Sequence, residues 1–95
     1  MAPEIDVKTS ELTGTYEFQV TVQDGRSSTQ HRVSLSKADY QRLVGGSGAS
    51  PERLVSASFR FLLEREPKES ILRSFDLTVI SRYFPEYERQ IQKRL

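Results

Sequence analysis

Residues 27–66 decide the fold of this chain, and they read SSTQHRVSLSKADYQRLVGGSGASPERLVSASFRFLLERE. In order, this stretch holds a strand pattern, a capped helix, a glycine-rich joint and a second capped helix. A strand region followed by helices predicts an α+β domain, in which the helices cover the apolar face of an antiparallel sheet.

The strand of this stretch has a predicted partner immediately upstream. Apolar and polar residues alternate over residues 15–22, which is the period of a half-buried strand. The dipeptide Asp24-Gly25 suits a two-residue hairpin turn in which both central positions need a positive φ. The resulting register pairs Val22 with Ser27, Val20 with Thr29, Phe18 with His31, Tyr16 with Val33, Glu17 with Arg32 and Gln19 with Gln30.

A weaker strand pattern precedes this hairpin. Ile5 and Val7 alternate with polar residues, and Thr13-Gly14 can turn the chain into the next strand. Residues 4–11 are therefore a candidate third strand. We expect an antiparallel β-meander of two or three strands with one apolar face.

Two main helices should follow the meander. Ser36 and Asp39 have the spacing of a capping box, which places the first helix at residues 37–44. The glycines of residues 45–48 end it. Ser50 as N-cap and Pro51 at the first helical position start the second helix, at residues 51–65.

The last third of the chain predicts shorter helices. Ile71, Leu72 and Phe75 fit a short helix, Asp76 can cap another, and residues 86–95 suit a polar final helix whose end can fray. The expected core consists of Phe18, Val20, Val33, Leu35, Leu43, Leu54, Phe59 and Leu62.

Length and composition indicate one small soluble domain. The 95 residues divide into the meander (4–35), a helix-loop-helix (36–66) and the short C-terminal helices (67–95). The net charge of +1 creates no overall field that attracts nucleic acid or anionic lipid. The chain start lacks a signal-peptide pattern, and no run approaches the roughly 20 apolar residues of a membrane helix. We expect a cytoplasmic protein without membrane contact.

The sequence offers no combination of residues suited to catalysis or cofactor binding. There is no cysteine, and His31 is the only histidine, so a metal site lacks ligands. By the predicted register His31 faces inward, which favours a histidine packed in the fold or at a strand edge over a catalytic one. Residues 45–51 lack the Lys-Ser/Thr pair of a phosphate-binding loop. We expect a non-enzymatic protein with no catalytic residue, metal or cofactor.

Two segments are similar to a known family. Residues 30–43 resemble the ribbon and first helix of ribbon-helix-helix (Arc/CopG-like) proteins, and residues 48–55 resemble the turn and second-helix start of that family. The resemblance implies a dimer whose outward strand residues enter the DNA major groove, as in a DNA-binding regulator or antitoxin. The matching positions here are Gln30, Arg32 and Ser34, with the amides near Ser50 holding a phosphate.

The favoured function is contact with a protein partner or with a second copy of the chain. The C-terminal segment, residues 73–87, resembles segments of small uncharacterised bacterial domains. Aromatic and arginine side chains are interleaved there, and they offer a surface for a partner. The candidate partner-binding residues are Arg73, Arg82, Tyr83, Tyr87 and Arg89.

Overall fold

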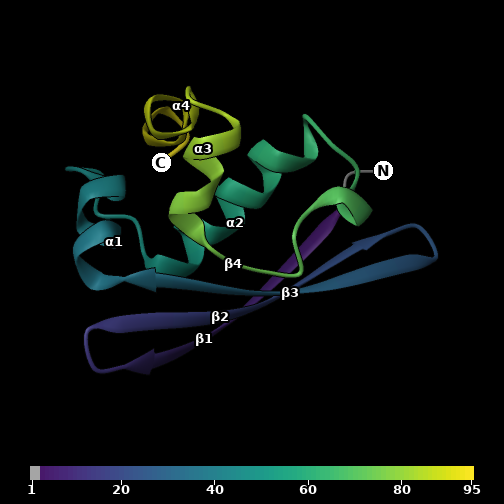
Figure 1. The fold of residues 1–95 in the computed structure, drawn as a ribbon, viewed down its shortest axis with the longest axis horizontal. Helices are drawn as coiled ribbons and strands as arrows, with labels where there is room; N and C mark the ends of the chain where they lie inside the picture. The colour runs from purple at the N-terminus through teal and green to yellow at the C-terminus, as the bar shows by residue number, and fades with distance from the viewer. Residues whose placement is uncertain (1–2) are drawn as a thin grey trace.

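The computed structural model describes residues 3–95, and its strands precede most of its helices (Figure 1). The elements are β1 (Glu4–Leu12), β2 (Thr15–Asp24), β3 (Ser27–Ser36), α1 (Lys37–Val44), α2 (Pro51–Leu63), the 3-10 helix η1 (Lys68–Ser70), β4 (Ser74–Asp76), the 3-10 helix η2 (Leu77–Val79), α3 (Ile80–Tyr83) and α4 (Tyr87–Lys93). The expected α+β class is confirmed.

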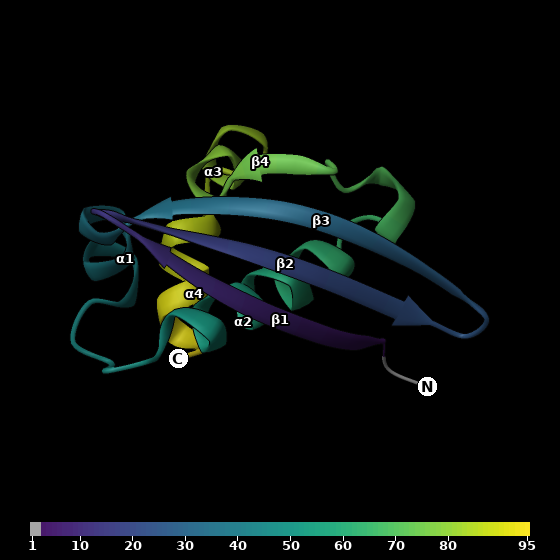
Figure 2. The ribbon, with the colours of Figure 1, turned by 90° about the horizontal axis from the view of Figure 1, so that it is seen from below.

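The elements form two layers. The strands make one sheet in the order β1-β2-β3-β4, and all the α-helices lie on one side of it (Figure 1). Seen from below in Figure 2, the other face of the sheet carries no helix. Side chains alternate between the two faces of a strand. The open face is therefore polar, with Lys8, Gln19 and Arg32 exposed, whereas Val20 and Val33 are buried under the helices.

β2 and β3 form the expected hairpin with a register that differs by two residues. Asp24 pairs with Ser27, so the turn consists of Gly25 and Arg26 rather than Asp24 and Gly25. Gly25 has a φ of +65°, whereas Arg26 has no positive φ. A positive φ only at the first central position fits a type II′ turn, which needs glycine there and accepts arginine next.

This register corrects the expected cross-strand pairs. Val33, not His31, lies opposite Phe18, and Arg32 lies opposite Gln19 rather than Glu17. The expected Glu17–Arg32 pair is therefore wrong. A shift of two residues leaves each side chain on its expected face, because the side-chain period of a strand is two. The prediction that His31 faces inward is consequently confirmed.

The third strand is present and is longer than expected. β1 pairs antiparallel with β2 from Glu4 to Leu12, across the turn formed by Thr13 and Gly14. Gly14 has a φ of +73°, a conformation that glycine adopts without steric cost. β1 is one edge of the sheet.

The sheet also has a fourth strand, which the sequence does not predict. Residues 74–76 form β4, parallel to β3, with Phe75 opposite Val33. The helix expected around Ile71, Leu72 and Phe75 is therefore wrong. The outer edge of β3 presents backbone groups that need partners, and the N–H of Arg32 donates to the carbonyl of Arg73 (2.8 Å). The sheet is thus a three-stranded meander extended by one parallel strand.

The helix starts follow the predicted caps. The hydroxyl of Ser36 accepts a hydrogen bond from the Asp39 N–H (3.0 Å), and that of Ser50 accepts one from the Arg53 N–H (3.1 Å). Asp76 likewise accepts from the Thr78 N–H (3.1 Å) at the start of η2. The second main helix ends at Leu63, slightly earlier than expected.

α2 is the central helix of the helical layer, because it packs against both the sheet and α4. The ring of Phe59 lies 5.3 Å from that of His31 and 6.1 Å from that of Phe75, measured between centroids. Every residue of the expected core is buried. Tyr87 and Ile91 place α4 against the other side of α2, and Arg94 donates two hydrogen bonds to Glu64 (2.8 and 2.6 Å).

Candidate functional site

An apolar hollow of the described surface lies at the C-terminal side of the fold, and we call it the C-terminal groove. It has a volume of about 320 Å³. The end of α2, the segment from η1 to β4, and the η2–α3 turn form its walls. The side chains that define it are Leu62, Glu66, Ile71, Leu72, Phe75 and Tyr83. Most of this lining is apolar, which is the usual character of a binding pocket.

Two apolar side chains at this groove are unusually exposed. The exposed fraction is 46% for Leu72 and 66% for Tyr83. Leu12, on the strand at the opposite edge of the sheet, is exposed to 52%. Single exposed apolar residues are ordinary on protein surfaces, but apolar residues that share a hollow mark an interaction site. Leu72 and Tyr83 both line the C-terminal groove, whereas Leu12 does not.

Glu66 supplies a carboxylate within this apolar lining. Its partial burial raises the pKa of the Glu66 carboxyl above the usual range. Among residues 3–95 no side chain forms an ion pair with Glu66. A carboxylate in this setting gains from a hydrogen-bond donor, so a ligand that brings an N–H into the groove would be favoured.

The wall that carries Leu72 is held by the core of the sheet. Nδ1 of His31 lies 2.7 Å from the carbonyl oxygen of Leu72, and Nε2 lies 2.8 Å from Oγ1 of Thr29. A carbonyl can only accept, so Nδ1 carries the proton and Nε2 of the neutral ring accepts from Thr29. Burial and the charge of Arg73 lower the pKa of His31, although its bond to Leu72 acts in the opposite direction. The ring therefore fixes the backbone of the groove wall and is only 2% exposed.

The opposite wall rests on an aromatic cluster. The rings of Phe61 and Phe84 meet edge to face at a centroid distance of 5.9 Å. The guanidinium of Arg65 lies 3.5 Å from the centre of the Phe61 ring and pairs with Glu86 (3.5 Å). A cation placed over an aromatic face is stabilising, so this cluster braces the turn that carries Tyr83.

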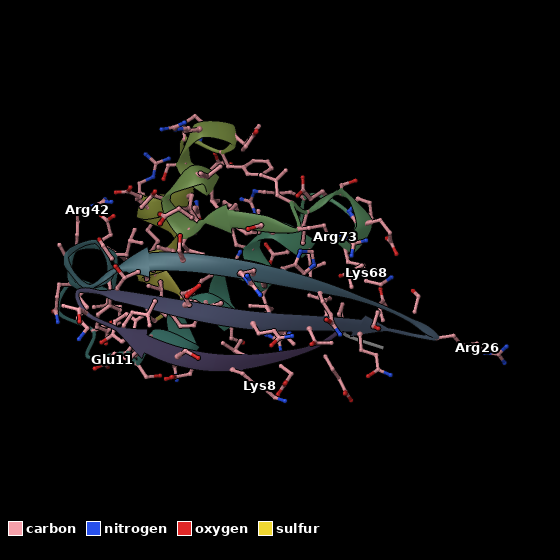
Figure 3. The ribbon with its side chains drawn as sticks, turned by 60° about the horizontal axis from the view of Figure 1, so that its bottom comes forward. Lys8, Glu11, Arg26, Arg42, Lys68 and Arg73 are labelled. Carbon is pink, nitrogen blue, oxygen red and sulfur yellow. The ribbon has the colours of Figure 1, made fainter. Side chains whose placement is uncertain are left out.

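The structure divides the five candidate partner-binding residues. Tyr83 lines the groove and Arg82 is its exposed neighbour on α3. Arg73 follows Leu72 and lies beside β4 (Figure 3). Tyr87 is fully buried, with its hydroxyl 2.6 Å from that of Ser58, so it offers no surface to a partner. Arg89 is exposed on α4 and does not line the groove.

The residues matched to the ribbon-helix-helix pattern lie elsewhere. Gln30 and Arg32 are exposed on the open face of the sheet, whereas Ser34 donates to Asp76 of β4 (2.8 Å). Ser50 uses its hydroxyl to cap α2. β3 pairs with β2 along its whole length on one side, and on the other side β4 pairs with it over residues 32–34.

Sequence reasoning missed Leu72 and Glu66 as groove residues. Leu72 was assigned to a short helix with Ile71 and Phe75, and nothing in that local pattern shows which of these side chains stays exposed. Within residues 3–95 no group of three or more His, Cys, Asp or Glu side chains is arranged to hold a metal ion. No helix in the described part of the chain is long and apolar enough to cross a membrane.

Comparison with known proteins adds no relative to these observations. No family model, no curated protein and no solved structure matches the chain. The function is therefore inferred from the geometry of the C-terminal groove and the surfaces around it.

Proposed function

We propose that this chain is a non-enzymatic binding protein whose C-terminal groove holds a short segment of a protein partner. The observation that carries the proposal is the joint exposure of Leu72 (46%) and Tyr83 (66%) at one apolar groove. A few apolar side chains of the partner would fill the groove and cover these two residues. Anchors of this kind supply most of the binding energy in protein interfaces.

The charges around the groove suggest the composition of the partner segment. Arg73 and Arg82 are exposed and adjoin the lining residues Leu72 and Tyr83 in the chain, and within residues 3–95 neither forms an ion pair. Complementary charges steer association and select partners. The partner segment should therefore carry Asp or Glu next to its apolar anchors, and a backbone N–H for Glu66.

The surroundings of His31 support the non-enzymatic part of the proposal. Histidine is the side chain best suited to move protons near neutral pH. Here both ring nitrogens of His31 are engaged by Thr29 and Leu72, and the ring is buried under Phe59. A catalytic group must reach its substrate within hydrogen-bonding distance. His31 is placed to hold the groove wall instead.

DNA binding through Gln30 and Arg32 is the alternative function, and we place it second. Both side chains are exposed on the open face of the sheet, which favours some contact role for that face. In a ribbon-helix-helix protein, however, the ribbon pairs with a second chain, whereas β3 here pairs with β2 along its whole length and with β4 over residues 32–34. Salt-dependent binding of duplex DNA that is lost in Arg32→Ala would reverse this ranking.

A peptide selection tests the proposed function. Peptides from a displayed random library are selected on the wild-type protein, and their affinities are measured by fluorescence polarisation against Leu72→Ala. Burying a whole leucine is worth about 1.5–3 kcal/mol. Covering the exposed half of Leu72 should contribute about 1 kcal/mol, so Leu72→Ala should weaken binding about fivefold.

Leu12→Ala is the matched control, because Leu12 is similarly exposed (52% against 46% for Leu72) but lies on β1, at the other edge of the sheet. Binding should be unchanged in this variant, and the selected peptides should combine apolar residues with Asp or Glu. Failure to select any peptide whose affinity depends on Leu72 would refute the proposal. An equal loss in Leu12→Ala would refute it as well.

A further inference from the structure

The outer edge of β1 is the longest free strand edge in the described part of the chain. β1 runs for nine residues, from Glu4 to Leu12, and has β2 on one side only. The other edge strand, β4, is three residues long. An edge of this length presents a row of backbone groups that can pair with another strand.

The register shows which backbone groups point outward. The pair that flanks a two-residue hairpin turn exchanges both of its backbone hydrogen bonds, and such pairs alternate along the ladder. Leu12 and Thr15 flank the first turn, so even-numbered residues of β1 bond to β2. The same rule directs the N–H of Arg32 away from β2, and it does donate to Arg73. The N–H and C=O groups of Ile5, Val7, Thr9 and Glu11 are therefore directed to the free edge.

We propose that a second copy of this chain pairs with the free edge of β1, antiparallel, with Val7 opposite Val7 of the second copy. This register places Asp6 opposite Lys8 of the second copy, twice by symmetry. Asp6 and Lys8 are exposed on the open face, and within residues 3–95 neither forms an ion pair. Figure 3 shows Lys8 at the outer edge of the sheet.

Charge complementarity selects this register among its neighbours. In a two-fold pairing, opposite residues must share a face of the sheet, so the register can change only in steps that keep this parity. One step in one direction places Lys8 opposite Lys8. One step in the other places Asp6 opposite Asp6, although Glu4 would then face Lys8. Like charges directly opposite each other are destabilising. Asp6 and Lys8 would occupy the pairs without mutual backbone bonds, in which side chains approach most closely.

α2 lies beside β1 and carries an acidic and a basic side chain near its two ends, Glu52 and Arg60. Arg60 of α2 lines a shallow hollow with Ile5 and Asp6. At the other end of α2, the Thr9 hydroxyl lies near the Glu52 carboxyl and lowers its pKa. α2 therefore runs antiparallel to β1, and its middle lies near Val7.

A two-fold axis at Val7 consequently passes near the middle of α2. The residues there are Ser56 and Ala57, which are small and half-buried. Glu52 and Arg60 lie equally far to either side of Ser56, so each would face its opposite charge on the second copy. Small residues between complementary charges allow two helices to lie side by side. This pairing goes beyond the proposed function and leaves both C-terminal grooves free, because they lie toward the β4 edge.

Sedimentation equilibrium tests the proposal. At about 100 μM chain, a concentration that populates any dimer of micromolar dissociation constant, we expect twice the chain mass of 10.9 kDa. Lys8→Asp places a second carboxylate opposite Asp6 at two symmetric positions and should weaken the dimer about tenfold or more. The double variant Asp6→Lys/Lys8→Asp restores the complementary pairs and should restore the dimer.

Two further variants test whether the dimer forms through the free edge of β1. Val7→Pro removes an N–H that no bond within the chain uses, so the fold should survive while the dimer is lost. Arg26→Asp changes an exposed charge at the β2–β3 turn and should leave the dimer unchanged. A monomeric wild type would overturn the proposal. A dimer that Lys8→Asp leaves intact, or that the double variant does not restore, would overturn it too.

Discussion

The buried hydrogen bond between Ser58 and Tyr87 gives a quantitative test of how α4 is held on α2. Oγ of Ser58 lies 2.7 Å from the carbonyl of Leu54 and 2.6 Å from the hydroxyl of Tyr87. Ser58 has one hydroxyl proton, and it must go to the carbonyl, which can only accept. The Tyr87 hydroxyl is therefore the donor to Ser58. Both residues are fully buried.

This direction predicts an asymmetric pair of single variants. Tyr87→Phe removes a donor from an oxygen that keeps its other bond, and it should cost about 0.5–1.5 kcal/mol of unfolding free energy. Ser58→Ala leaves the Tyr87 hydroxyl buried without a partner, at a cost of about 1–3 kcal/mol. The better helix propensity of alanine offsets about 0.5 kcal/mol of that loss. Ser58→Ala should therefore be the more destabilising of the two.

The double variant distinguishes this bond from general packing. Removing both hydroxyls leaves no buried group unpaired, so Ser58→Ala/Tyr87→Phe should cost about 1 kcal/mol less than the sum of the single variants. Urea unfolding with a constant slope measures these differences. Tyr83→Phe is the control, because Tyr83 is 66% exposed and its hydroxyl should contribute less than about 0.5 kcal/mol. Additive single variants, or no loss in Tyr87→Phe, would refute the reasoning.

The same tyrosine has a predicted pH signature. Burial raises the pKa of Tyr87 far above its usual value. Because the unfolded chain ionises near the ordinary tyrosine pKa of about 10, stability from this group is complete below that pH and is lost as the pH rises above it. The loss between pH 9 and 11 should be smaller in Tyr87→Phe than in the wild type. Equal losses would show that other groups cause it.

Three other variants probe the fold by urea unfolding. Phe59→Ala should cost about 3–5 kcal/mol, because its buried ring joins the sheet to α2; a loss below about 1 kcal/mol would contradict that packing. His31 has a lowered pKa, so wild-type stability should fall as the pH drops below 6.5, and His31→Gln should show a smaller fall; identical pH profiles would contradict the buried neutral ring. Ser50→Ala should cost about 1 kcal/mol by removing the cap of α2, and a neutral result would show that the cap bond contributes nothing.

Local patterns predicted most of the secondary structure. The alternation in residues 15–22 placed a strand, and the hydroxyls of Ser36 and Ser50 placed two helix starts to the residue. These features depend on neighbours a few positions apart, which a sequence displays directly. The turn at Gly25 was displaced by one residue, since Asp24-Gly25 and Gly25-Arg26 both suit a hairpin.

The features that local patterns did not predict all depend on distant contacts. Residues 74–76 become a strand because β3 offers them an unfilled edge, although Phe75 and its neighbours also fit a helix. Tyr87 was expected at a surface, and it is buried because Ser58 and Phe61 of α2 receive its hydroxyl and its ring. Leu72 was expected in a short helix, and the bond from His31 to its carbonyl holds the chain where its side chain remains exposed.

The sequence by itself determined the α+β class, the apolar face of the sheet and eight residues of the core, because periodicity and capping act over a few residues. Tertiary structure alone decided the fourth strand, the C-terminal groove and the free edge of β1. Each of these depends on which backbone groups and apolar side chains are left without a partner once the rest of the chain has packed. Contacts between residues far apart in the sequence, such as that of His31 with Leu72 41 positions later, decide which groups stay without a partner. No local pattern encodes these contacts.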